Sequence, residues 1–513
     1  MDTNNYVKIA VEDATPQFPS FLQGFNRRWF AGNCEAIYLC YNAQGTAQAL
    51  EDAIINYGDK VKIKGGGHCY ENFVFSNDTK AIIDVGPMND VGYEADKGYY
   101  LGSGGTNWSA FKTLFRDYGK VLPAGSCYSV GLGGHICGGG YGLLSRLNGL
   151  TTDWLTGLEI VVKPSARKPA KTVYVTADSD NDAGNLFWAS TGGGGGNFGV
   201  ITRYYFKELP TVPQTALLTT IAFKWDALNL PAFKKLLDWY ANFSATTPRN
   251  QFGLFKLLHV ANQEIQLIIQ TTITKDLKRE AAYNLIQQQL QELSAIASHH
   301  TPQAPIFGHG NIQVHPSSSH TTEYTYYEIS QTLNGSGANQ RGKYKSAYMR
   351  KAFPPAHIKA IYEYLHIVPN GLTLVDMQQS LLQVDTYGGR INTINPSTTA
   401  IAQRSSIMKL QYQTYWTDES KDAFHLQWIR DFYSTVYAAT GGTPSPALDP
   451  NNNVDGCYYN YCDSDLNDIV GKEGALRLYF LDNLPRLVGT KQQWDPNNYF
   501  NHAQSFPVSL DET

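Results

Sequence analysis

An aspartate in an otherwise apolar stretch is the first residue of this chain that could do acid–base chemistry. The segment LLQVDTYGG, Leu381–Gly389, begins as a predicted strand. On a strand, Gln383 and Asp385 share a face, which Tyr387 joins if the strand continues. A carboxyl group in an apolar strand is unusual unless it is paired, so Asp385 is a candidate base that removes a proton from a substrate hydroxyl. An aspartate that caps the turn at Gly388 is the alternative.

A second set of polar residues alternates along the segment KLQYQTYW, Lys409–Trp416. Gln411, Gln413 and Tyr415 share one face of this predicted strand, and together with Gln383 they could line a polar substrate site. Polar residues that face solvent on a half-exposed sheet are the alternative.

Three glycine-rich loops leave or enter predicted strands: Gly65–Gly67, Gly131–Gly142 and Gly192–Gly196. Glycine costs roughly 0.5–1 kcal/mol relative to alanine in regular structure, so its dense use indicates backbone that approaches a ligand closely. Tight turns between short strands are the alternative.

The same loops restrict the ligand. Backbone amides of such loops can hold a pyrophosphate without a lysine. None of the loops has the strand–GxGxxG–helix context of an NAD site, and a Walker lysine is missing from the sequence. The ligand that remains is a large dinucleotide such as FAD.

Two regions that differ in the length of their predicted strands and helices must position these groups. Before Pro210 and Pro213, short strands alternate with short helices; beyond these prolines, strands and helices are longer, and the final segment, Leu476–Phe506, returns to short elements. The pattern predicts an α+β protein rather than a regular βαβ sheet. The predicted strands are Ala36–Cys40, Val61–Ile63, Ala81–Val85, Tyr99–Leu101, Leu158–Lys163, Ala216–Phe223, Glu264–Ile273, Leu381–Asp385 and Ile407–Trp416. The predicted helices are Thr46–Tyr57, Asn107–Tyr118, Leu230–Phe243, Lys275–Ser298 and Phe424–Tyr437, with a loop at His299–His320. The segment Leu186–Lys207 is expected to begin as a helix and to continue through a five-glycine loop into a strand.

Composition argues against several classes of function. The 513 residues carry a net charge of −4 and no basic block, which argues against nucleic acid as a partner. An apolar run long enough to span a membrane is absent from the sequence, and its seven cysteines show no metal-ligand spacing. The N-terminus lacks a cationic segment followed by an apolar run, so no signal peptide is predicted; the chain is then cytoplasmic or a mature secreted form.

Several motifs together carry a family resemblance. The chain resembles the FAD-linked oxidases of the vanillyl-alcohol oxidase superfamily, and within it the berberine-bridge-enzyme-like branch. The motifs are GGGHCYENF (Gly65–Phe73), GSCYSVGLGGHICGGGYG (Gly125–Gly142), GGGGGNFGVITRYYF (Gly192–Phe206), NYCDSDL (Asn460–Leu466) and WDPNNYF (Trp494–Phe500). QGFNRRW (Gln23–Trp29), NGSGANQRGKYKSAYM (Asn334–Met349) and KLQYQTYW sharpen the resemblance toward the hexose-oxidase-like carbohydrate oxidases of that branch.

The resemblance covers the whole chain and implies its architecture. We expect a two-domain α+β flavoprotein with a PCMH-type FAD-binding domain, residues 1–210 completed by 470–513. Residues 211–469 are expected to form a substrate domain, an antiparallel sheet backed by helices. The flavin is expected at the interface of the two domains, where ligand sites are common.

The resemblance also implies that FAD is held by two covalent bonds, from His68 and Cys127. A neutral imidazole and a thiolate are nucleophiles able to add to an electron-poor flavin ring. A hydrogen-bonded loop histidine and a small buried apolar cysteine are the alternatives. By the same analogy Val130 goes with access of O2 to the flavin, whereas Cys69 is expected to point to the other side and to be structural. The other residues expected to bind the cofactor are Gly65, Gly66, Gly67, Gly131, Gly133, Gly134, Gly138, Gly142, Asn197, Gly199, Val200, Asn460 and Asn498.

For catalysis the resemblance implies Tyr461, the tyrosine of the NY motif, with Asp385 as its helper. A phenol with a pKa of about 10 is a poor base at neutral pH unless a carboxylate accepts its proton or cations favour the phenolate. A pair of Tyr387 and Tyr461 is a second pattern in the branch, and Tyr458 opens the same motif.

The implied reaction is oxidation of the C1 hydroxyl of an aldose, free or in an oligosaccharide, to the lactone, with O2 reduced to H2O2. Gln383, Gln411, Gln413 and Tyr415 are then expected to bind the sugar. One rival is oxidation of an alcohol on a glycosylated secondary metabolite, which the Tyr387 pattern keeps open. The other is a sugar-binding flavoprotein with poor turnover.

Overall fold

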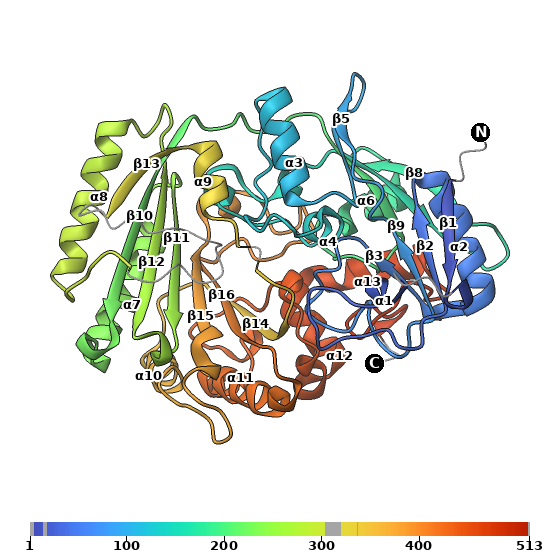
Figure 1. Cartoon of the computed structure of the whole chain (residues 1–513). Coiled ribbons are helices and arrows are strands. Elements are labelled where there is room, and N and C mark those ends of the chain that lie inside the picture. The colour runs from blue at the N-terminus through green and yellow to red at the C-terminus, as the bar shows by residue number, and fades with distance from the viewer. Residues whose placement is uncertain (1–4, 14–17, 303–319, 336, 511–513) are drawn as a thin grey trace.

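The computed structural model describes residues 5–13, 18–302, 320–335 and 337–510. The expected loop at His299–His320 therefore lies mostly outside the described residues. In these ranges the strands form three sheets. Figure 1 shows the two N-terminal sheets in one half of the molecule and the third, larger sheet in the other.

The N-terminal half contains a four-stranded and a five-stranded sheet. In the first, the strand order is β1 (Tyr6–Ala10), β2 (Ala36–Cys40), β4 (Ala81–Asp84) and β3 (Val61–Lys64), with β2, β4 and β3 parallel. Helix α2 (Ala43–Tyr57) packs on it through Ala49, Leu50, Ala53 and Ile54. The second sheet is antiparallel, in the order β5 (Val91–Glu94), β6 (Gly98–Gly102), β9 (Val200–Phe206), β7 (Gly157–Val162) and β8 (Lys171–Thr176).

The other half is built on a seven-stranded antiparallel sheet. Its helices are α7 (Leu230–Thr246), α8 (Arg279–Ser294), α10 (Pro355–Tyr364) and α11 (Asp422–Val436), and Figure 1 shows them along the outer side of the sheet. The strand order is β13 (Thr321–Thr325), β10 (Thr215–Lys224), β12 (Glu264–Thr272), β11 (Gln251–Leu258), β15 (Ser380–Thr386), β16 (Met408–Trp416) and β14 (Arg341–Met349). The inner side of β11, β15 and β16 faces the N-terminal half (Figure 1), and residues of these strands line a cavity together with its glycine-rich loops.

The C-terminal segment returns to the N-terminal half. It forms helices α12 (Asp465–Phe480) and α13 (Leu484–Trp494), where short elements were expected. Gly471 interrupts α12 with a φ of +74°, so its apolar residues do not follow one stripe that the sequence would reveal. Two hydrogen bonds join this segment to Asn197. Lys491 on α13 donates to the Asn197 carbonyl at 3.0 Å, and the Phe506 amide donates to the Asn197 side chain at 3.4 Å. These contacts support the division that we propose, 1–210 with 470–513 against 211–469.

The predicted α+β class is confirmed, and the predicted strands and most helices occur within a few residues of their expected bounds. Helix α2 begins at Ala43 rather than Thr46 because the Asn42 side chain caps it. The helix expected at Asn107–Tyr118 is divided into α3 (Asn107–Thr113) and a wider turn that ends at Tyr118. Strands β1, β5, β8, β11, β13 and β14 and helices α9 (Tyr326–Thr332) and α10 add to the predicted set. Helix α6 (Asn181–Ala189) and strand β9 correspond to the helix and strand expected within Leu186–Lys207.

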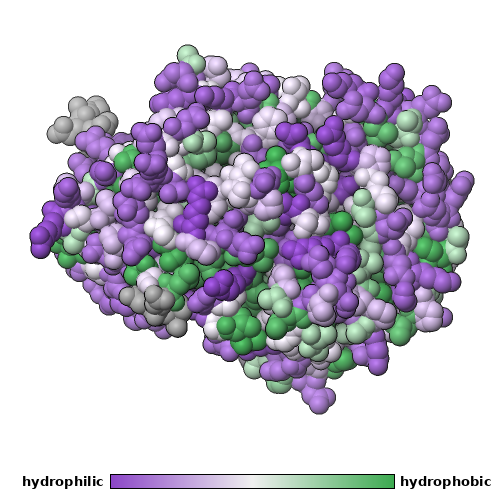
Figure 2. All heavy atoms as spheres, turned by 180° about the vertical axis from the view of Figure 1, so that it is seen from behind, coloured by the Kyte–Doolittle hydropathy of each residue, from purple (hydrophilic) through white to green (hydrophobic). Residues whose placement is uncertain are grey.

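Hydrophilic side chains cover most of the face shown in Figure 2, and apolar ones lie between them in small groups. Within the described ranges, none of the helices combines the length and apolar character that crossing a bilayer needs. In the same ranges, no cluster of three or more His, Cys, Asp or Glu side chains is arranged to hold a metal ion.

Candidate active site

A cavity of about 920 Å³ lies between the two halves of the molecule. Its walls come from the glycine-rich loops on one side and from β11, β15 and β16 on the other. Most of the residues singled out from the sequence line it: Gly65, Gly66, Gly67, His68, Cys127, Val130, Gly131, Gly133, Gly134, Gly142, Asn197, Gly199, Gln383, Asp385, Gln411, Gln413, Tyr415, Asn460 and Tyr461.

Three expected cofactor residues lie outside the cavity wall. Gly138 packs so closely on the Asn460 side chain that a Cβ atom would overlap it, so this glycine makes room for Asn460. Val200 is fully buried at the start of β9. Asn498 adopts a φ of +52°, and its carbonyl accepts from Asn501 at 2.9 Å, which is a turn function.

Glycine is required where the first two loops meet. A Cβ atom on Gly66 would lie 2.6 Å from the Cα atom of Gly131, and one on Gly131 would lie equally close to Gly66. Side chains at either position would push the loops apart. The bare backbone that results can approach a dinucleotide, so the residues present fit the expected FAD.

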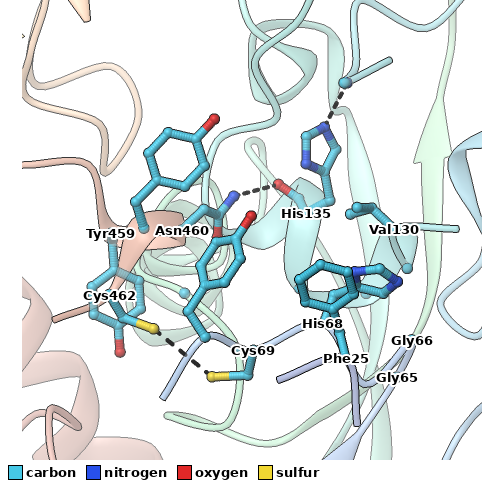
Figure 3. Close-up of a pocket in the computed structure, with 18 of the residues that line it drawn as sticks. Phe25, Gly65, Gly66, His68, Cys69, Val130, His135, Tyr459, Asn460 and Cys462 are labelled. Atoms are coloured by element: carbon cyan, nitrogen blue, oxygen red, sulfur yellow. Dashed lines mark hydrogen bonds between the residues drawn. The ribbon is translucent and has the colours of Figure 1, made fainter. Parts of the chain in front are cut away.

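His68 follows the first glycine loop, and its ring stacks on Phe25 with a centroid distance of 4.8 Å (Figure 3). Burial lowers the pKa of His68 to about 4, although a backbone hydrogen bond at Ser129 opposes the shift. The imidazole is therefore neutral at pH 7, which leaves one ring nitrogen with a free lone pair for bond formation.

Cys127 lies on the second glycine loop. Burial raises the pKa of its thiol, and the positive charge of Lys256 opposes that rise. The carbonyl of Cys127 accepts from the Asn107 side chain at 3.1 Å, which fixes the loop against the start of α3. His68 and Cys127 thus line one cavity although they come from separate loops.

A buried lysine connects Tyr461 to Asp385. Lys409, fully buried on β16, donates to the Tyr461 hydroxyl at 3.1 Å and pairs with Asp385 at 2.8 Å. Its Nζ atom also lies 4.3 Å from the centre of the Tyr461 ring. Burial, and next the charge of Asp385, holds the pKa of Tyr461 well above its usual range, whereas burial lowers the pKa of Lys409 and Asp385 opposes that shift.

The hydrogen-bonded chain continues along the sheet. Gln383 donates to Asp385 at 2.7 Å and accepts from Lys256 at 2.9 Å. Lys256 lies on β11, and burial lowers its pKa to about 7, although Asp385 raises it. Two buried lysines therefore flank the hydrogen-bonded Gln383 and Asp385 next to Tyr461, and their positive charges oppose the effect of burial on a negative charge at the cavity wall.

Tyr387 does not join this face, because the strand does not continue as far as Tyr387. Strand β15 ends at Thr386, and Gly388 has a φ of +83°, so the chain turns away. The Tyr387 ring is fully buried beside Tyr141, and its hydroxyl donates to the carbonyl of Gln403 at 3.1 Å.

Tyr458 lines the cavity, but its hydroxyl accepts from Asn460 at 3.0 Å. The hydroxyl that meets Lys409 is that of Tyr461. Cys69 also lines the cavity, where a side chain pointing away was expected. Strand β3 ends at Lys64, so the alternation of an extended strand does not apply to His68 and Cys69.

Four residues of the site were not predicted from the sequence. Lys256, Tyr70 and Tyr344 line the cavity, and Lys409 contacts Tyr461 in its wall. A signal existed for Lys409, because it continues the alternation of Gln411 and Gln413 on one strand. A lysine in the apolar strand around Lys256 was a similar signal. Tyr70 and Tyr344 stack with a centroid distance of 3.7 Å across elements far apart in sequence, which only the fold reveals.

Comparison of the sequence with known proteins also indicates an FAD-linked oxidase. A family model for an FAD binding domain matches residues 39–165, and a model described as berberine and berberine like matches residues 457–507. Hexose oxidase from Chondrus crispus is 46% identical, over 98% of this chain and 96% of the relative. Aclacinomycin-N/aclacinomycin-A oxidase from Streptomyces galilaeus is 32% identical, over 94% of this chain and 86% of the relative.

A solved glycopeptide hexose oxidase, complexed with teicoplanin, superposes with a TM-score of 0.84 at 30% identity, covering 98% of this chain and 99% of that one. The full-length matches and the two family models support the same assignment. This chain belongs to the berberine-bridge-enzyme-like family of FAD-linked oxidases and is an FAD-dependent oxidoreductase.

Proposed function

We propose that this chain oxidises the C1 hydroxyl of aldoses, as monosaccharides or oligosaccharides, to the lactone and reduces O2 to H2O2. One observation carries the proposal: Tyr461, in contact with Lys409 and through it with Asp385, opens on the cavity that the candidate flavin anchors also line. A base on one wall and a cofactor on another are what the two-electron oxidation of an alcohol requires. The similarity to hexose oxidase supports the sugar class.

We infer that FAD is attached through both His68 and Cys127. The neutral imidazole of His68 is ready to form a bond, and the Lys256 charge favours the thiolate of Cys127 that bond formation needs. Val130 lines the same cavity, and we place the access of O2 there. When bound, FAD supplies the acceptor for the hydride of C1 and passes the electrons to O2.

The proton of the C1 hydroxyl goes to Tyr461. Because burial and Asp385 disfavour the phenolate, this base needs a cation, which Lys409 provides at 3.1 Å. Asp385 favours the charged form of Lys409 and so opposes the lowering of its pKa by burial. Removal of the proton as the C1 hydrogen leaves prevents a positive charge from remaining on the oxidised sugar.

The sugar is expected to lie against Gln411, Gln413 and Tyr415, whose amide and phenol groups suit a ring of hydroxyls. The stacked pair Tyr70 and Tyr344 adds an apolar face that suits the C–H face of a pyranose. Gln383 was assigned to the sugar as well, but its amide bonds to Asp385 and Lys256. We therefore assign Gln383 the additional task of orienting Asp385.

The rival function, oxidation of an alcohol on a glycosylated secondary metabolite, rested on the Tyr387 pattern. The buried position of Tyr387 removes that support. The other rival, a sugar-binding flavoprotein with poor turnover, needs no base. Burying the Lys409–Asp385 pair beside Tyr461 costs desolvation free energy, and binding a sugar alone gives no reason for that cost.

Anaerobic flavin reduction against a panel of glucose, galactose, lactose and cello-oligosaccharides tests the proposal. Bleaching of the flavin absorbance by at least one sugar, with release of H2O2 once air is admitted, is the expected result. Full-length, flavin-loaded protein that no sugar of the panel reduces would overturn it.

A further inference from the structure

Two free thiols face each other inside the cavity. The sulfur atoms of Cys69 and Cys462 are 3.8 Å apart, although the residues are separated by 393 positions in the chain (Figure 3). Both line the cavity that holds the candidate base and the candidate flavin anchors. Cys69 directly follows His68, and Cys462 directly follows Tyr461, so the pair joins the two loops on which the chemistry depends.

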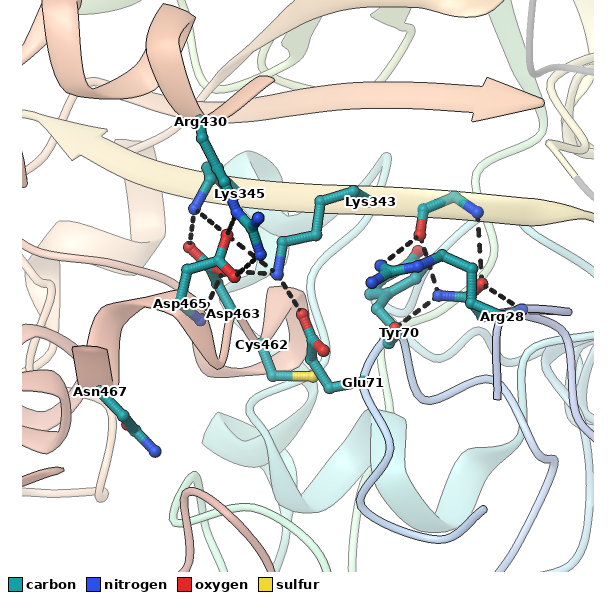
Figure 4. Close-up of polar contacts among 12 residues, drawn as sticks. Arg28, Tyr70, Glu71, Lys343, Lys345, Arg430, Cys462, Asp463, Asp465 and Asn467 are labelled. Atoms are coloured by element: carbon teal, nitrogen blue, oxygen red, sulfur yellow. Dashed lines mark hydrogen bonds and ion pairs between the residues drawn. The ribbon is translucent and has the colours of Figure 1, made fainter. Parts of the chain in front are cut away.

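Buried ion pairs hold these loops side by side. Lys343 on β14 contacts Glu71 at 2.5 Å and Asp463 at 2.7 Å, and its side chain and both carboxylates are at most 2% exposed. Glu71 lies two residues after Cys69, and Asp463 directly follows Cys462. Figure 4 shows this lysine between the two segments. A second lysine, Lys345, pairs with Asp463 at 2.7 Å and secures the same loop.

The ion pairs of Lys343 with Glu71 and Asp463, which we call the Lys343 clamp, keep the two thiols close together. Separation of the loops would take Glu71 or Asp463 away from the buried Lys343 charge, which is unfavourable because buried ion pairs are costly to break. The two sulfurs, 3.8 Å apart, therefore stay within about 2 Å of disulfide bonding distance, and closing that gap moves the residues beside them. Cys69 is half-buried, whereas Cys462 is buried and donates or accepts a hydrogen bond with Cys69. That hydrogen bond, together with burial, raises the pKa of Cys462, so Cys69 is the thiol that reacts first.

We propose that Cys69 and Cys462 are a peroxide-sensitive dithiol, and that their disulfide ties the His68 loop to the Tyr461 loop and slows sugar oxidation. The oxidant is H2O2, the product of the proposed function, on which this inference rests for its supply in turnover. Peroxide formed in the cavity is released into the space that both of these cysteines line.

The chemistry needs two steps. In the first, the Cys69 sulfur attacks H2O2: the O–O bond breaks, an S–O bond forms, sulfur is oxidised and one water leaves. In the second, the Cys462 sulfur attacks the Cys69 sulfur: the S–O bond breaks, the S–S bond forms and a second water leaves with the Cys462 proton. Two thiols and one H2O2 thus give one disulfide and two waters.

The disulfide slows the reaction because it displaces the neighbours of the two sulfurs. The bond draws the sulfurs closer than the present 3.8 Å, and the movement is shared by His68 and Tyr461. A misplacement of roughly 1 Å at a reacting group can cost on the order of 100-fold in rate. We expect kcat to fall at least about tenfold in the oxidised protein.

The test uses the purified holoenzyme with its FAD and added H2O2, without sugar. After alkylation of the remaining thiols, peptide mass spectrometry is expected to find Cys69 linked to Cys462, and kcat is expected to recover on treatment with dithiothreitol. The Cys69→Ser and Cys462→Ser variants should lose both the linked peptide and the dithiothreitol-reversible inhibition. Cys34→Ser, which replaces a buried cysteine outside the cavity, should retain both.

Absence of the linked peptide at peroxide doses that oxidise other residues overturns the proposal. A linked peptide with unchanged kcat, or equal inhibition of Cys69→Ser, overturns the regulatory role. The mass spectrum requires no sugar turnover, so it separates the two proposals: a holoenzyme that forms the disulfide but oxidises no sugar refutes the proposed function alone.

Discussion

Replacement of Lys409 by methionine tests the central electrostatic argument. The substitution keeps most of the volume of a fully buried side chain and removes the charge that lies 3.1 Å from the Tyr461 oxygen. At that distance and an effective dielectric constant of about 20, the attraction between an ammonium and a phenolate is about 5 kcal/mol, or about 4 pKa units. Tyr461 is only half-buried, so solvent screens part of this attraction, and we expect the pKa of Tyr461 to rise by about 2 units, within the range seen for close charge pairs.

The expected kinetic result follows from the proton balance. A rise of 2 units lowers the phenolate fraction about 100-fold wherever the pH is below the pKa of Tyr461, so the rate of flavin reduction at pH 7 should fall about 100-fold. The rate should then recover about tenfold for each pH unit as the solution becomes more alkaline. Anaerobic stopped-flow measurement of flavin bleaching from pH 6 to pH 9, at saturating sugar, gives both numbers.

Lys345→Met is the matched control. Lys345 is as deeply buried and pairs with Asp463 and Asp465, so its loss also breaks buried ion pairs, but it does not contact the Tyr461 hydroxyl. Both variants should lose stability, by about 3–5 kcal/mol as is typical of a broken buried ion pair. The rate of reduction should fall about 100-fold in Lys409→Met alone, at every pH from 6 to 9. A fully flavinylated Lys409→Met protein with the rate and pH profile of the parent would refute the reasoning.

Three further predictions follow from the same site. Tyr461→Phe should keep the covalent flavin and lose most of the reduction rate, whereas Tyr387→Phe should retain most of it because Tyr387 lies outside the cavity; equal losses in stopped-flow bleaching would contradict this assignment. His68→Ala and Cys127→Ala should each leave FAD attached by one bond, and the double variant should release it on acid precipitation; a double variant that retains yellow protein would exclude these anchors. Burial lowers the pKa of Lys256 from 10.5 to about 7, so between these pH values the unfolded chain binds more protons than the folded one. The free energy of unfolding, relative to that of Lys256→Met, should therefore rise with pH across this window. Below about pH 7 the difference between the two proteins should stay constant. Thermal unfolding of both proteins at several pH values checks the trend, and a constant difference would be the opposing result.

The glycine loops and the motif residues could be predicted from the sequence because their information is local. Adjacent glycines indicate backbone that approaches another group closely. In the structure this close approach is the contact between Gly66 and Gly131. The shared face of Gln383 and Asp385 was also predictable, because alternation along a strand is a property of the strand itself.

Only the tertiary structure decided what these residues meet. The antiparallel register places Asp385 opposite Lys409 and Gln383 opposite Lys256, and a shift by one residue would have turned Lys409 to the other face. Register is set by pairing between distant segments, so no local pattern encodes it. Likewise the end of β15 removed Tyr387 from the cavity, and the buried clamp at Lys343 brought Cys69 to Cys462. Composition and motifs determined the cofactor and the class of chemistry, whereas the packing of the two halves determined which charges act on the base.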